Sequence, residues 1–150
     1  MSLVALQSPQ DASKEFEKSI ALAPVQSESY FRLGLLDLDS KDLDSAEKNL
    51  RRALERDPKH AGALAGLGRL RFEQKAYAEA VDFLQRAVAS NDALREAHYY
   101  LGLTYARLGR TQESNEQLQI ATRLEHEETE KQRTMLRILD PGDGSDSTQK

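Results

Sequence analysis

Apolar residues recur along most of this chain at helical spacing. Between residues 27 and 40 they form two adjacent helical stripes that share Leu38, one with Tyr30 and Leu33 and the other with Phe31 and Leu35. Two buried stripes on one helix imply two sets of neighbours. A second helix is expected over residues 43–56, after a polar break at residues 40–42 whose length suits an antiparallel helix hairpin.

The same pattern returns twice at a fixed offset. Gly34, Gly68 and Gly102 are 34 residues apart, and each follows a leucine. Another leucine stands 16 residues after each glycine, and an alanine follows three residues later. Glycine inside a helix costs about 1 kcal/mol relative to alanine, so three glycines at one phase predict a close helix approach. We expect Ala46 and Ala80 to lie opposite the first two glycines.

These positions resemble the tetratricopeptide repeat, whose signature alternates large and small residues over 34 positions. The residues that carry the resemblance in the first copy are Tyr30, Leu33, Gly34, Ala46, Leu50, Ala53 and Pro58. It covers about residues 11–124. Asp37 and Arg71 depart from it at a position that Tyr105 fills in the third copy, and Asp92 and His126 replace the expected proline.

The resemblance implies an all-α fold, a right-handed superhelical stack of antiparallel helix pairs. It divides the chain into three full repeats with one N-terminal half repeat and a C-terminal capping or extended helix. The expected segments are a truncated N-terminus (1–9), the second helix of a partial repeat (10–24), the repeats (27–60, 61–94 and 95–126), a C-terminal helix (127–139) and a disordered tail (140–150).

The C-terminal helix has two alternative arrangements. No helix breaker stands at Glu125–His126, so the last repeat helix could run unbroken toward Leu139. Alternatively, the chain bends near His126, and the apolar residues of the last helix cover the open end of the third repeat. Those residues are Met135, Leu136, Ile138 and Leu139. The sequence leaves both open.

Composition narrows the class of partner. The 150 residues are 39% hydrophobic and 31% charged, which is typical of a soluble, helix-rich domain. The net charge of −4 argues against a nucleic-acid partner, because that class needs a basic face. No run of about 18 apolar residues exists, so no membrane insertion is expected. The N-terminus shows no signal-peptide pattern, which favours a cytoplasmic location over a periplasmic or secreted one and otherwise leaves location unknown.

Metal, cofactor and catalytic chemistry find little support. The chain has no cysteine, and its histidines, His60, His98 and His126, are far apart in the sequence and lack metal-ligand spacing. No nucleophile elbow, phosphate loop or nucleotide fingerprint is present. We therefore expect no metal, no cofactor and no enzyme activity.

The resemblance implies that the first helices of successive repeats line a concave groove that binds extended or helical peptides. The residues expected in this groove are Phe31, Leu35, Leu38, Ala65, Arg69, Phe72, Tyr99, Leu103 and Arg107. Arg69 and Arg107 would hold an acidic group. A second interpretation stays open, in which Phe31 and Tyr99 only pack between repeats.

Some members of this family clamp the acidic C-terminal peptides of chaperones with lysine and asparagine. This chain has Phe31, Leu35 and Arg69 at those places, which argues against a chaperone-tail receptor. We therefore predict a non-catalytic protein–protein interaction module that binds a peptide or helix of a protein partner in its groove. The alternative is a structural element that forms a homodimer or larger homo-oligomer through exposed terminal helices.

Overall fold

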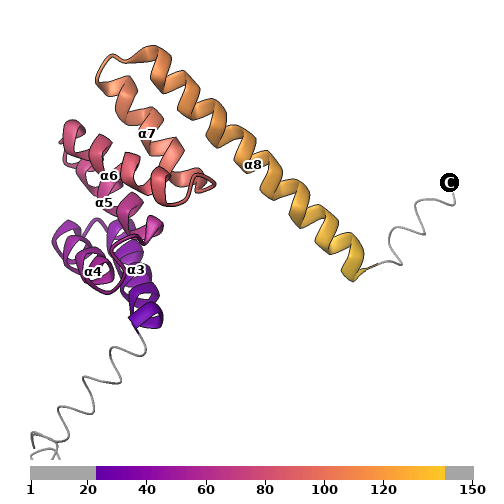
Figure 1. Cartoon of the computed structure of the whole chain (residues 1–150), viewed down its shortest axis with the longest axis horizontal. Helices are drawn as coiled ribbons and strands as arrows, with labels where there is room; N and C mark the ends of the chain where they lie inside the picture. Colours follow the sequence, from indigo (N-terminus) through magenta and orange to yellow (C-terminus); the bar gives the residue numbers. More distant parts are fainter. Residues whose placement is uncertain (1–22, 141–150) are drawn as a thin grey trace, which may run out of the picture.

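The computed structural model describes residues 23–140, which form six helices and, within that range, no strand. In chain order they are α3 (Ala23–Asp39), α4 (Leu43–Arg56), α5 (Ala61–Glu73), α6 (Tyr77–Ser90), α7 (Arg95–Arg107) and α8 (Thr111–Leu139). Figure 1 shows them as successive hairpins, with α8 running far beyond the others.

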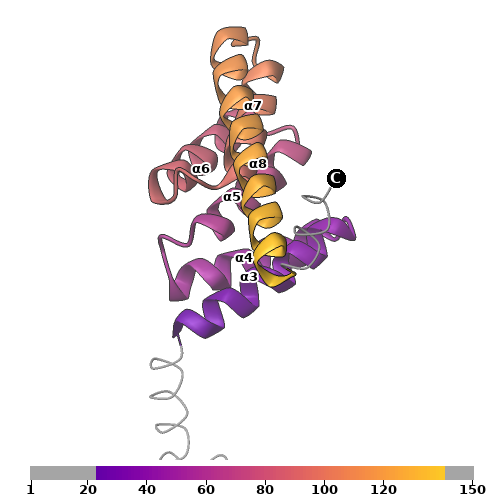
Figure 2. The ribbon, with the colours of Figure 1, turned by 90° about the vertical axis from the view of Figure 1, so that its right-hand side faces the viewer.

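The helices pack as a superhelical stack of antiparallel pairs. The helices of each hairpin contact each other, namely α3 with α4, α5 with α6 and α7 with α8. The first helices also contact one another, α3 with α5 and α5 with α7. Between hairpins, α4 contacts α5 and α6 contacts α7 (Figure 2). The predicted all-α stack is thereby confirmed.

The expected helix over 10–24 falls mostly outside the described residues, as do the segments 1–9 and 141–150. The described part places Pro24 inside α3, not at the end of the preceding helix as the sequence pattern indicates. Proline is compatible with the beginning of a helix, where its missing N–H has no partner to lose.

Each hairpin turn places one residue in the left-handed region at the same point of the repeat. These residues are Lys41 (φ 65°), Lys75 (φ 63°) and Gly109 (φ 78°). Only the third turn uses glycine, which adopts this conformation without steric cost. The turns therefore keep one geometry although their sequences differ.

The repeats are separated by local capping. Asp57 ends α4 in an extended conformation before Pro58, and His60 Nδ1 accepts a hydrogen bond from the Ala63 N–H at the start of α5. Asn91 Oδ1 accepts from the Ala93 N–H in the turn where proline is missing, and α7 then begins after Leu94 without a side-chain cap. At Glu125–His126 no such break occurs, and α8 continues to Leu139.

The repeated glycines each admit a leucine of the paired helix. A Cβ built on Gly34 would lie 2.7 Å from Leu50 Cγ, and one on Gly102 would lie 2.7 Å from Leu118 Cγ. Gly68 meets Leu84 still more closely. The atoms nearest to the first two glycines belong to these leucines, whereas Gly102 also meets the backbone oxygen of Ser114, the residue equivalent to Ala46 and Ala80, at 3.2 Å. Both alanines are fully buried in the neighbouring core.

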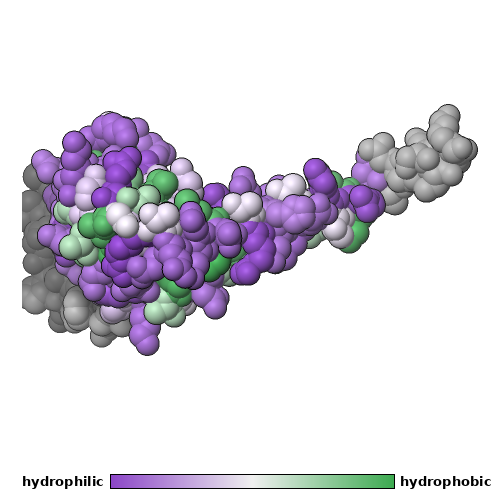
Figure 3. All heavy atoms as spheres, turned by 90° about the horizontal axis from the view of Figure 1, so that it is seen from above, coloured by the Kyte–Doolittle hydropathy of each residue, from purple (hydrophilic) through white to green (hydrophobic). Residues whose placement is uncertain are grey.

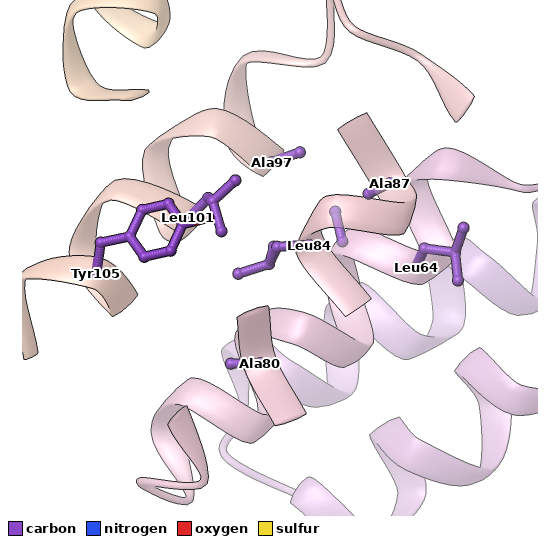
Figure 4. Close-up of a cluster of buried hydrophobic side chains, with 8 residues drawn as sticks. Leu64, Ala80, Leu84, Ala87, Ala97, Leu101 and Tyr105 are labelled. Atoms are coloured by element: carbon purple, nitrogen blue, oxygen red, sulfur yellow. The ribbon is translucent and has the colours of Figure 1, made fainter. Parts of the chain in front are cut away.

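The core continues from repeat to repeat along these leucines. Figure 4 shows Leu101 and Tyr105 of α7 pointing toward Leu84 of α6, with Leu64 of α5 in the same cluster. The position before the glycine is buried in the second and third repeats, where Leu67 and Leu101 are at most 3% exposed. Its equivalent in α3, Leu33, is 48% exposed, because no helix precedes α3 in the described part of the chain.

Polar contacts replace the aromatic residue that the repeat signature loses at Arg71. The guanidinium of Arg71 donates to both carboxylate oxygens of Glu47 in α4, at 3.1 and 2.8 Å, and its Nε lies 2.8 Å from Glu79 in α6. The equivalent Tyr105 is buried, and its hydroxyl accepts from Gln85 Nε2 at 2.9 Å. One position thus ties each of these two first helices to the second helix of the preceding repeat.

The close contact at Gly68 predicts a conditional effect on stability. Gly68→Ala should lower the free energy of unfolding by about 1–3 kcal/mol, because Leu84 is fully buried and has little room to move. In a Leu84→Ala background the same change should be neutral or stabilising by up to about 1 kcal/mol, since only helix propensity remains. Urea unfolding of the four proteins measures the coupling; an equal loss in both backgrounds contradicts the contact.

The ion pair at Glu47 predicts an acid-dependent contribution to stability. The hydrogen bond from Arg71 is the largest cause that holds the pKa of Glu47 at about 2, below its usual 4.5; burial opposes it and Arg51 adds to it. Because the folded-state pKa is lowered, the contribution is complete above pH 4.5 and disappears as the pH falls toward 2.

Glu47→Gln should therefore lower the free energy of unfolding by about 1–2 kcal/mol at pH 7, a modest value because solvent screens this part-exposed pair. At pH 2 the variant and the parent should be nearly equal. Glu55→Gln is the matched control, because Glu55 lies exposed on the same helix and its one ion pair within residues 23–140 is with Arg56, at 3.7 Å. Denaturant melts across this pH range would reject the assignment if both variants behaved alike.

Candidate partner-binding surface

A small pocket lies where the first helices meet. Its lining comes from α3, α5 and the beginning of α7: Phe31, Leu35, Gly62, Ala65, Gly66, Arg69, Leu94 and Glu96. Its volume is about 30 Å³, enough for about one water molecule or a methyl group and too small for a large side chain. The pocket is mostly apolar, with Arg69 and Glu96 as its charged members.

Phe31 and Gly62 form one wall of this pocket. The ring of Phe31 lies 4.8 Å from the ring of His60, measured between centroids, and a Cβ on Gly62 would come within 2.7 Å of the Phe31 ring. His60 is held in turn by Glu28, whose Oε1 is 3.0 Å from His60 Nε2. The half-buried Phe31 thus packs between repeats and also borders the pocket.

Arg69 is already neutralised by carboxylates of the chain. Its Nε donates to Glu73 Oε2 and its Nη2 to Asp39 Oδ1, each at 3.2 Å. Burial acts to lower the pKa of Arg69, but Tyr100, Glu73 and Asp39 raise it, so the guanidinium stays charged. The two carboxylates leave little net positive charge at this place. The attraction of Arg69 for an acidic partner is therefore weaker than the sequence predicts.

An aromatic cluster extends from Arg69 toward Arg107. The Arg69 guanidinium lies 5.8 Å from the Tyr100 ring, which packs edge-on against Phe72, and Phe72 also contacts Tyr77. Arg107 lies over the Phe72 ring and donates to the Tyr77 hydroxyl at 3.3 Å. Among residues 23–140 no carboxylate pairs with Arg107, so its charge is available on the surface.

The remaining predicted residues lie apart from the pocket. Leu38 is fully buried in the core between α3 and α5, and offers no surface to a partner. Leu103 is half-buried. Tyr99 is 42% exposed but borders a different groove, between α7 and α8. Of the nine predicted residues, Phe31, Leu35, Ala65 and Arg69 share the pocket.

Sequence reasoning missed Leu94 and Glu96 as pocket residues. The repeat register contained a signal for both, because Leu94 is equivalent to His60 and Glu96 to Gly62, and both of these contact Phe31. Glu96 is exposed and forms no ion pair within the described chain. The surface therefore carries one unpaired acid at the pocket and one unpaired base at the aromatic cluster.

A second groove lies at the C-terminal end of the stack. Its walls are formed by residues of α7 and α8: Arg95, Tyr99, Leu118, Ala121, Thr122 and Glu125. At about 430 Å³ it has room for large side chains. Helix α8 is the last described helix, and α7 is the only described helix that it contacts.

Residues 23–140 contain no cluster of three or more acidic or histidine side chains arranged to hold a metal ion. Within the same residues no helix combines the length and the apolar character needed to cross a membrane.

Comparisons with known proteins agree with this architecture. Residues 31–95 match the family model described as "Tetratricopeptide repeat". Human "Cilia- and flagella-associated protein 70" is 32% identical over 71% of the chain, and "Lipopolysaccharide assembly protein B" of Escherichia coli K12 is 31% identical over 80%. The chain spans only 10% and 31% of these two relatives.

Among solved structures, the second repeat domain of Spaghetti (RPAP3), bound to the HSP90 peptide SRMEEVD, superposes with a TM-score of 0.65. It is 17% identical, and the match covers 71% of this chain and 98% of that domain. At this identity the likeness concerns the fold. The 34-residue period, the hairpin stack and the family model that matches residues 31–95 together show that this part of the chain is built of tetratricopeptide repeats.

Proposed function

We propose that this chain binds an extended peptide segment of a protein partner on the face formed by α3, α5 and α7. Tetratricopeptide repeats are in general non-catalytic scaffolds for protein–protein interaction, and we infer no enzyme activity for this chain. The observation that carries the proposal is the apolar pocket at Phe31, from which an aromatic surface continues to the unpaired Arg107.

The geometry favours a particular kind of peptide. The pocket of about 30 Å³ takes a methyl-sized side chain, that of alanine, and nothing larger. An acidic group would pair with Arg107, and a basic one with Glu96. Arg69, held by Glu73 and Asp39, orients the surface and contributes little net charge.

Peptide selection tests this proposal. A phage-displayed library of random peptides, panned on the full chain, should yield sequences with a small apolar residue and a nearby acid. Arg107→Glu should weaken the selected peptide about 10-fold or more, because attraction becomes repulsion, with unchanged unfolding. Arg86→Glu is the matched control, as Arg86 lies exposed on α6. Equal affinities for both variants in isothermal titration calorimetry would rule out this surface.

The HSP90 peptide SRMEEVD, bound by the solved relative, supplies a second probe. We expect no saturable binding of this peptide to the present chain at concentrations up to about 1 mM, which corresponds to a binding free energy near −4 kcal/mol. The reason is that Phe31 and Leu35 are apolar and Arg69 is already paired with two carboxylates. Tight binding in fluorescence anisotropy would show instead that the chain provides a carboxylate clamp.

A second candidate function is self-association through a terminal helix. The observation that favours it is the apolar tip of α8, where Met135, Leu136, Ile138 and Leu139 are 56–72% exposed. Sedimentation equilibrium of the full chain between about 1 and 100 μM should then show a concentration-dependent dimer. A strictly monomeric chain across that range would contradict self-association and leave peptide binding untouched.

A further inference from the structure

The distal part of α8, from Glu125 to Leu139, is exposed along its whole length and ends in the apolar tip described above. Figure 3 shows it as a largely hydrophilic rod with hydrophobic side chains gathered toward its end. Four large apolar side chains in five residues cost free energy in water, and such a patch marks an interaction site.

The tip does not reach the chain's own core. Arg95, the first residue of α7, lies 3.7 Å from Glu128, so α8 beyond this point runs past the end of its only helical neighbour. At 1.5 Å per residue, Leu139 lies about 16 Å farther along the axis. No capping residue or proline interrupts α8, so folding the tip back would require breaking a continuous helix.

Charges divide the distal part of α8 into two blocks. Residues 125–130 carry four glutamates and no lysine or arginine, whereas residues 131–139 carry three bases, Lys131, Arg133 and Arg137, and no acid. Two such helices side by side and antiparallel place each acidic block beside the basic block of the other copy. A parallel arrangement would place like charges together, which is unfavourable.

The groove between α7 and α8 has the place and the chemistry to accept the tip. Its apolar walls come from Tyr99, Leu118 and Ala121. Its volume of about 430 Å³ is more than ten times that of the small pocket at Phe31. Thr122 in this groove precedes Ile138 by 16 residues, and Glu130 lies midway. A two-fold axis beside Glu130 would therefore bring the tip of each copy onto the groove of the other.

We propose that α8 is a dimerisation element: two copies pair the distal parts of α8 antiparallel, and each apolar tip docks in the α7/α8 groove of the second copy. The inference rests on the second candidate function, self-association, and specifies its geometry. The contact is the same on both copies, so the assembly closes as a two-fold dimer and does not propagate into fibres.

Sedimentation of variants tests whether the tip forms the contact. Met135→Glu combined with Ile138→Glu should raise the dimer dissociation constant about 100-fold or more, because two buried apolar anchors become charged. Val25→Glu is the matched control, since Val25 is 62% exposed on α3, at the opposite end of the stack. A dimer that persists in the double variant overturns this geometry while self-association itself stands.

Disulfide cross-linking tests whether the two α8 helices are antiparallel and whether the tip docks on a second copy. The chain has no native cysteine, so only the introduced thiols can react. Ile138→Cys mixed with Thr122→Cys should form disulfide-linked heterodimers, whereas Ile138→Cys alone should not, because its two introduced thiols lie about 24 Å apart in the antiparallel pair. Linkage of Ile138→Cys to itself indicates parallel helices, and a linked monomer of the variant that carries both substitutions indicates a tip folded onto its own chain. Either result overturns the proposal.

Discussion

The close contact between a glycine of each first helix and a leucine of its paired helix is the constraint on which the stack depends. Gly34 admits Leu50, Gly68 admits Leu84 and Gly102 admits Leu118. Because the two helices approach this closely, Leu50 and Leu84 are fully shielded from water and still reach the next repeat. Leu50, for example, also contacts Gly66 of α5. The repeated glycine therefore sets the hairpin spacing, and Gly66 lets the same leucine approach the second hairpin.

This packing divides the surface into faces with different roles. Within each hairpin the glycine–leucine contact occupies one side of the first helix, which leaves the side with Phe31, Arg69 and Phe72 free to form a continuous aromatic and polar surface. The ion pairs of Arg71 with Glu47 and Glu79 join α5 to α4 and to α6. A rigid scaffold of this kind would present the proposed binding residues already ordered, which lowers the entropic cost of binding.

The sequence predicted the fold well because the repeat period records packing directly. The glycines, the leucines before and after them and the alanines that follow were all visible as fixed spacings. The binding surface was harder to predict, because ion pairing depends on residues far apart in the chain. The sequence does not show that Arg69 is paired with Asp39, 30 residues earlier, whose Oδ1 lies 3.2 Å from Arg69 Nη2. Leu38 looked available although the neighbouring helix buries it.

The C-terminal helix shows a different limit of sequence reasoning. The missing breaker at Glu125–His126 allowed two arrangements, since local propensity for helix favours continuity while apolar side chains favour folding back. In the structure α8 is continuous, which keeps every backbone hydrogen bond of the helix and leaves the apolar tip uncovered. In the proposed dimer a second molecule covers the apolar tip, so the helix stays continuous and the tip is still buried.

The central claim is that the face of α3, α5 and α7 is the one that recognises a partner. Amide chemical-shift mapping by nuclear magnetic resonance, with a library-selected peptide titrated into isotope-labelled chain, measures this most directly. The account predicts that perturbed amides cluster around Phe31, Ala65, Glu96 and Arg107, with the outer surfaces of α4 and α6 unchanged. Perturbations concentrated on α4 and α6 would contradict it.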